Sequence, residues 1–184
     1  MGVARDLLLV WMNRNGSWRK PWQPFTLGSA AINPVNAATA VHSVALAQSL
    51  ASSVTLVRRQ FPAAQPNLSP WRDDPCTRHW DEATTLDLAF DFPGWSPRLQ
   101  CRSLLLQLRL NSEPEEMASS SPSLLGVVMR GMTFEGERWR LATVGDWFPA
   151  GPHLPHPDQV VRLQVICREL FEVFEKSVPN RTSS

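Results

Sequence analysis

The chain has 184 residues, of which 18 are basic and 17 are acidic, so its formal net charge is +1. This length suits one domain that buries most of its apolar surface, and a hydrophobic share of 43% excludes a wholly disordered chain. The nearly balanced charge points to no particular class of partner. The three cysteines, Cys76, Cys101 and Cys167, exclude a disulfide framework and leave an unpaired thiol, so we expect a reducing compartment, the cytoplasm.

The first part of the chain combines one short predicted strand with a stretch rich in proline and tryptophan. Residues 6–13 form an apolar run that ends in a turn signal, which predicts a strand. The prolines at positions 21, 24 and 34 then prevent regular structure. Cationic and indole side chains alternate within this stretch, at Trp18, Arg19, Lys20 and Trp22. Such an alternation occurs in surfaces that bind proteins or single-stranded nucleic acid.

No charged side chain occurs between Lys20 and Arg58, although charged residues make up 19% of the chain. Within this gap, residues 36–59 contain neither Gly nor Pro, begin with Asn and end in two arginines, which predicts a helix. The apolar residues recur at spacings of three and four and line one face: Leu46, Leu50, Val54, Val57 and Phe61, flanked by Val41, Val44 and Ala45. The opposite face is polar without being charged, so it suits packing against another surface.

Two other interpretations of the uncharged gap have less support. A transmembrane span needs about 20 predominantly apolar residues, and His42, Gln48 and several hydroxyl side chains argue against one. An organellar transit peptide is amphipathic and poor in acids, as residues 7–72 are, but Asp6 and the proline-rich stretch argue against it. A mitochondrial or plastid protein with a transit peptide within residues 1–60 therefore stays as the alternative hypothesis.

The second half of the chain predicts an antiparallel sheet followed by a helix. Residues 84–92 alternate between apolar side chains and polar ones such as Asp87, which predicts a strand with one face in solvent. Further strands are predicted over residues 99–110, 124–134 and 138–144. The strongest helix pattern covers residues 158–176, with Asp158 as N-cap and an apolar stripe made of Val160, Leu163, Cys167, Leu170 and Phe174.

Together these elements predict an α+β domain, in which an antiparallel meander sheet of four to five strands has two helices packed on one face. The domain covers residues 1–177 and includes a loop at 62–75 and a mobile loop at 111–123, with a disordered tail at 178–184. Cys101 and Cys167 fall at inward-facing positions and are expected to be inert. Many unrelated functions use this architecture, so it predicts no activity.

Two groups of metal-ligating side chains occur, and neither is a complete site. One group lies in a loop and consists of Asp73, Asp74, Cys76 and His79. A structural zinc site needs four ligands, and no second Cys or His pair follows at short spacing. The other group, His153 and His156, lies in a proline-rich loop. We therefore predict no metal or other cofactor, and a small enzyme or ligand-binding domain that uses these loops is the second hypothesis.

Tryptophans beside proline-bearing loops suggest a surface for binding. Exposed Trp and Arg are the residue types most often found at interface hot spots. The predicted interaction residues are Trp18, Arg19, Lys20, Trp22, Trp71, Trp95 and Trp147. The first hypothesis is a non-enzymatic accessory protein that binds another protein, as an assembly or chaperone-like factor. Nucleic acid is not the expected partner, because three or four cations make too small a basic patch.

Overall fold

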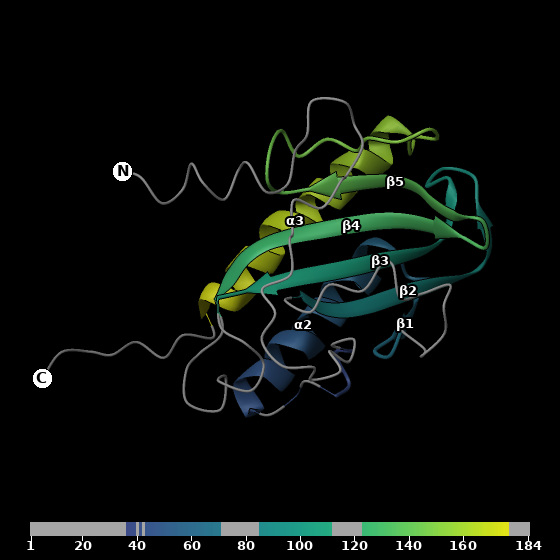
Figure 1. Ribbon diagram of the computed structural model, residues 1–184. Coiled ribbons are helices and arrows are strands. Elements are labelled where there is room, and N and C mark those ends of the chain that lie inside the picture. The colour runs from purple at the N-terminus through teal and green to yellow at the C-terminus, as the bar shows by residue number, and fades with distance from the viewer. Residues whose placement is uncertain (1–35, 40, 42, 71–84, 112–122, 177–184) are drawn as a thin grey trace, which may run out of the picture.

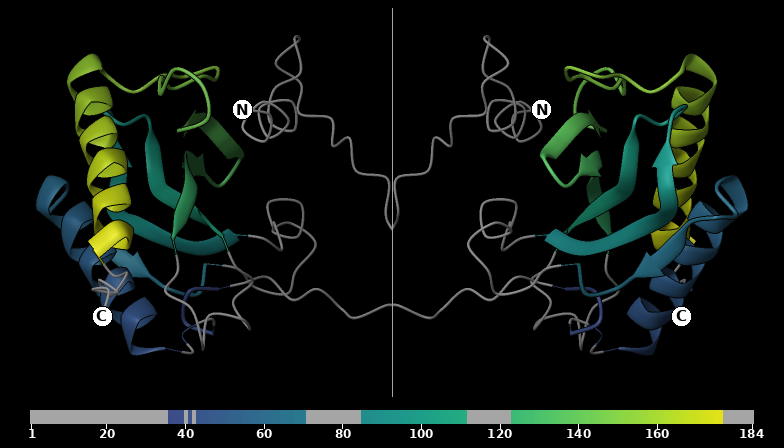
Figure 2. Two further views of the ribbon diagram at one scale, coloured as in Figure 1. Left: turned by 90° about the vertical axis from the view of Figure 1, so that its left-hand side faces the viewer. Right: turned by 90° about the vertical axis from the view of Figure 1, so that its right-hand side faces the viewer.

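The computed structural model describes residues 36–39, 41, 43–70, 85–111 and 123–176. The elements in chain order are α2 (Val44–Gln60), β1 (Gln65–Asn67), β2 (Thr85–Ser96), β3 (Cys101–Leu110), β4 (Leu124–Thr133), β5 (Gly136–Ala142) and α3 (Pro157–Lys176). The strands form one antiparallel sheet in chain order, and α2 and α3 lie side by side on one face of it (Figure 1 and Figure 2). The predicted α+β meander is thereby confirmed. The strand predicted at residues 6–13 lies outside the described residues.

Helix α2 begins later than the sequence pattern predicts. The Ser43 hydroxyl accepts a hydrogen bond from the backbone N–H of Leu46 at 3.2 Å, so Ser43 is the N-cap. The helix does not begin at residue 36, because the backbone there is bound to the sheet. Asn36 bridges to Asp87 of β2, and the Ala37 N–H donates to the Asp87 carbonyl at 3.0 Å. The predicted start of this helix is therefore wrong.

The face of α2 that packs on the sheet is partly polar. Its buried apolar residues include three that the sequence predicts, Leu46, Leu50 and Val57, and the predicted Phe61 is buried just after the helix as its C-cap. Ser49 and Ser53 are buried among them, and the Ser53 hydroxyl donates to the Ser49 carbonyl at 2.7 Å within the helix. The predicted apolar flank is wrong at Val41 and Val44, which are 40% and 75% exposed. Within the described ranges, neither helix is long and apolar enough to cross a membrane.

The hydrophobic core fills the space between the two helices and the sheet. Its largest fully buried side chains include Trp139, Phe90 and Phe174. Trp139 of β5 lies opposite Gly131 of β4, and a Cβ added at Gly131 would lie 2.3 Å from the indole, so this position requires glycine. The indole N–H donates to the Leu99 carbonyl at 2.6 Å, which ties the turn after β2 to the core.

Cys101 of β3 and Cys167 of α3 lie in the same core with buried thiols. Desolvation by burial raises the pKa of each thiol to about 12. Both thiols are therefore neutral at physiological pH and have little nucleophilic thiolate. They act as small hydrophobic side chains, as the sequence predicts.

The face of the sheet opposite the helices carries a line of polar side chains that crosses four strands. This polar row consists of Asp87, Gln107, Arg130, Glu137 and Arg140. Gln107 donates to Asp87 at 3.1 Å, and Nε of Arg130 donates to Gln107 at 2.8 Å. Arg130 and Arg140 contact the two oxygens of Glu137 at 2.5 and 2.6 Å. Asp87 is buried, so the prediction that it faces solvent is wrong.

Neither edge of the described sheet offers a long free strand. β1 falls within the stretch that the sequence predicts as a loop, and it is only three residues long and contains Pro66. At the other edge, Arg140 of β5 exchanges two backbone hydrogen bonds with Ala150, at 2.9 and 2.8 Å. The sheet is therefore poorly suited to accept a strand from another chain.

Candidate functional site

Three connections meet at one end of the sheet, which we call the hairpin end. They are the turn at 97–100 between β2 and β3, the turn at 134–135 between β4 and β5, and the loop at 150–156 before α3. The loop is bound to both hairpins, because the His156 N–H donates to the Arg98 carbonyl at 2.7 Å and the His153 N–H to the Arg138 carbonyl at 3.3 Å. At Gly151 of this loop φ is +152°, and a Cβ would lie 2.4 Å from the Arg138 carbonyl oxygen, so the close approach requires glycine.

Two exposed aromatic rings lie at the hairpin end, each beside an arginine. Trp95, near the end of β2, is 43% exposed, and the guanidinium carbon of Arg138 lies 5.8 Å from the centre of its ring. Phe134, in the turn after β4, is 90% exposed, and the guanidinium carbon of Arg102 lies 4.8 Å from its ring centre. Such cation–π contacts contribute about 0.5–1 kcal/mol at exposed positions. They hold each arginine near a ring that is itself open to a partner.

The arginines of the hairpin end differ in their partners. Arg98 pairs with Asp158 of α3, which also contacts Nδ1 of His156. Arg102 and Arg138 pair with no carboxylate among the residues that the structure describes. Nε of Arg138 is buried and has no hydrogen-bond acceptor there either. Two of these three arginines therefore keep unused capacity to bind an anion.

Asp158 fastens the loop of the hairpin end to α3. The helix begins at Pro157, so Asp158 lies in its first turn and the prediction of Asp158 as N-cap is wrong. Desolvation opposes ionisation, but hydrogen bonds from Arg98, His156 and Gln159 outweigh it and lower the pKa of Asp158 to about 2. The carboxylate is therefore ionised at physiological pH and already bound to side chains of the protein.

The two predicted groups of metal ligands lie in different parts of the chain. Asp73, Asp74, Cys76 and His79 lie outside the described residues. His153 and His156 lie in the loop of the hairpin end, where His156 contacts Asp158. Within the described ranges, no three His, Cys, Asp or Glu side chains are grouped so that they could hold a metal ion. The described geometry therefore adds no support to a catalytic role for these histidines.

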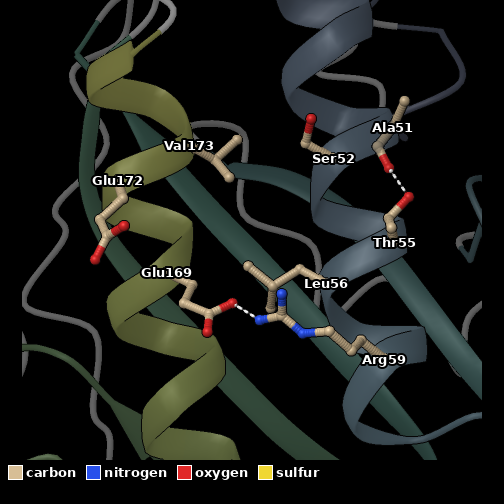
Figure 3. A pocket seen from close by; sticks show the side chains of 8 residues that line it. All are labelled: Ala51, Ser52, Thr55, Leu56, Arg59, Glu169, Glu172 and Val173. Atoms are coloured by element: carbon tan, nitrogen blue, oxygen red, sulfur yellow. Dashed lines mark hydrogen bonds and ion pairs between the residues drawn. The ribbon is translucent and has the colours of Figure 1, made fainter.

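A groove of about 580 Å³ lies between α2 and α3 (Figure 3). Its lining consists of Ala51, Ser52, Thr55, Leu56, Arg59, Glu169, Glu172 and Val173. Arg59 and Glu169 pair across it, and the Thr55 hydroxyl donates to the Ala51 carbonyl at 2.9 Å. Small-molecule sites usually have mainly apolar and aromatic walls with a few converging polar groups. This groove has small, aliphatic and charged walls without an aromatic side chain, and Arg59 and Glu169 already pair with each other, so it is a weaker candidate than the hairpin end.

The predicted interaction residues fall into three groups. Those outside the described residues are Trp18, Arg19, Lys20, Trp22 and Trp71. Trp95 lies exposed at the hairpin end. Trp147 is partly buried, and its ring stacks on Phe171 of α3 with 6.0 Å between centroids. Trp147 therefore anchors its loop to the helix, whereas Trp95 is available to a partner.

Sequence reasoning missed Phe134, Arg102 and Arg138. The apolar alternation places Phe134 inside a strand over residues 124–134, whereas β4 ends at Thr133. The Glu-Gly pair that follows is a turn signal and could have placed Phe134 in the turn. No signal in the sequence pairs either arginine with its ring, because each pair joins segments that are distant along the chain.

Comparison with known proteins places the chain in a family but gives no activity. Residues 38–176 match a family that is described as a domain of unknown function. The match covers more than half of the chain, so the protein belongs to this family. No curated protein and no solved structure matches the chain. Its function must therefore be argued from the hairpin end itself.

Proposed function

We propose that the protein is a non-enzymatic accessory protein, such as an assembly or chaperone-like factor, that binds another protein through the hairpin end. One observation carries the proposal: Trp95 and Phe134 are exposed at the same end of the sheet, each beside an arginine. Burying a phenylalanine side chain stabilises by about 2 kcal/mol, a contribution that Phe134 gains only when a partner covers it. Aromatic residues and arginine are also the types enriched in interface cores.

The surroundings of these rings support a preformed surface. The loop at 150–156 is hydrogen-bonded to both hairpins and adds the exposed side chain of Leu154. The hydrogen bond from the Trp139 indole to the Leu99 carbonyl holds the turn at 97–100 against the hydrophobic core. A surface that is ordered before binding loses little conformational entropy when the partner arrives. Because β1 is a three-residue edge strand with a proline and the β5 edge is bonded to Ala150, recognition is expected to use side chains and not an added strand.

The test is a comparative pull-down with the tagged full-length chain. The double variant Trp95→Ala, Phe134→Ala should lose the partner that the wild type recovers. Its melting temperature should fall only slightly, because Phe134 is almost fully exposed and Trp95 is partly exposed and lies outside the hydrophobic core. Leu125→Ala is the matched control, since it removes a side chain that is 53% exposed at the start of β4, the opposite end of the sheet from Phe134. This control should retain the partner.

Two results would contradict the proposal: the double variant keeps the partner, or Leu125→Ala loses it equally. Either result would remove the hairpin end as the contact surface. The variant Trp18→Ala, Trp22→Ala tests the other predicted surface in the same assay. If only that variant loses the partner, the contact lies in the N-terminal stretch and not at the hairpin end.

A further inference from the structure

The charge of the hairpin end limits the kind of partner that fits it. Arg102 and Arg138 lie beside the two exposed rings, and neither pairs with a carboxylate in the part of the chain that the structure describes. Arg98, in the neighbouring turn, is neutralised by Asp158. Glu135, exposed beside Phe134, offsets part of the charge of the other two arginines, so a smaller positive charge remains beside the apolar surface that a partner would cover.

An arginine held beside an aromatic ring can still bind an anion. Its N–H donors lie in the plane of the guanidinium, and they match the two oxygens of a carboxylate in a bidentate pair. Contact with the ring restricts the side chain in advance, so less rotamer freedom is lost on binding.

We propose that the partner binds the hairpin end through an acidic segment, whose carboxylates pair with Arg102 and Arg138 while an apolar side chain covers Phe134. This inference rests on the proposed function and names the chemistry of its partner. Charge complementarity favours an acidic partner, because a negative segment would meet two arginines that pair with no described carboxylate. Single-stranded nucleic acid fits less well, since two arginines neutralise only about two phosphates and an arginine already lies over each ring.

The test measures fluorescence anisotropy with the full-length protein and three labelled probes. The first probe is the peptide Leu-Glu-Glu-Leu-Glu-Glu, the second has Gln in place of each Glu, and the third is a short oligothymidylate. We expect the Glu peptide alone to bind, and the double variant Arg102→Gln, Arg138→Gln to weaken it about tenfold or more. Arg168→Gln, on the exposed side of α3, removes the same charge elsewhere and should leave binding unchanged.

Two further variants keep the result interpretable. Arg102→Gln alone changes an exposed side chain and should weaken the Glu peptide about threefold, even if the double variant melts early. Glu135 is exposed in the same turn as Phe134 and opposes a negative partner. Glu135→Gln should therefore strengthen binding of the Glu peptide, an increase that a purely structural role of the turn would not produce.

Three outcomes would contradict the proposal that the partner binds through an acidic segment. They are equal binding of the Gln and Glu peptides, no binding of either peptide, or tighter binding of the oligothymidylate. Each of them leaves the proposed function standing as long as the pull-down partner is lost with Trp95→Ala and Phe134→Ala. If the double variant Trp95→Ala, Phe134→Ala instead kept its partner in the pull-down, the proposed function itself would be wrong. The two failures are therefore distinguishable.

Discussion

The two faces of the sheet are both buried across their middle strands, but their chemistry differs. The face toward the helices is filled by apolar side chains such as Leu106 and Leu108. The opposite face buries Asp87, Gln107 and Arg130, which are bonded to one another across the strands. Apolar burial is non-directional, whereas a polar network depends on the geometry of each member. The first face therefore contributes most of the stability, and the second fixes the strand register, because a one-residue slip would break its bonds.

The largest effect is expected from truncation on the helix-covered face. Leu106 is 1% exposed, and Leu106→Ala should destabilise the protein by about 3–4 kcal/mol through lost burial and a cavity. Leu105, the preceding residue of β3, lies on the opposite face in a small cluster with Ala89 and Met132. Leu105→Ala should therefore cost only about 2 kcal/mol. Urea denaturation measures both values, and equal losses would show that the two faces do not differ in this way.

A smaller loss is expected from the polar row. Glu137→Gln keeps the shape of the side chain but removes the charge that Arg130 and Arg140 share. Because Arg130 is buried, the loss should be about 2 kcal/mol, less than for complete removal of a buried partner. Glu135→Gln, two residues earlier and exposed, is the matched control and should change stability by less than about 0.5 kcal/mol. Similar values for the two variants would mean that the row contributes little to folding.

The smallest effect is expected at Asp158, which joins the hairpin end to the helix-covered side. Its pKa in the folded protein, about 2, lies below the ordinary 3.8, so its stabilisation is complete above about pH 4 and is lost as pH falls toward 2. The difference in melting temperature between wild type and Asp158→Asn should therefore shrink across that interval. Arg98→Gln removes the other half of the pair and should show the same pH dependence. A difference that stays constant with pH would contradict the ion pair.

The periodicity of apolar residues in the sequence predicted which face of an element is buried. The stripe of α3 is the clearest case, since Leu163, Cys167, Leu170 and Phe174 are fully buried as their spacing predicts, and only Val160 at its start is partly exposed. β1 was not predictable, because three residues that include Pro66 carry no periodic signal. The start of α2 was missed because residues near Asn36 bind β2, a contact between distant segments.

The same limit applies to the candidate site. Residue type was enough to name Trp95 as a candidate for binding. Burial of Asp87 and the placement of Arg102 over Phe134 depend on neighbouring strands and turns, so they required the register of the sheet. Sequence reasoning therefore identified one ring of the hairpin end but not the arrangement that gives this surface its charge.

The strand order also bears on how the protein folds. Each strand of the sheet pairs with the strand that follows it in the chain, and short turns close the β2–β3 and β4–β5 pairs. Such local topology favours fast assembly of successive hairpins. The contact between α2 and α3 is different, because Arg59 and Glu169 are separated by almost the whole described chain. The groove between the helices is therefore the place where the first and last elements of the described chain meet.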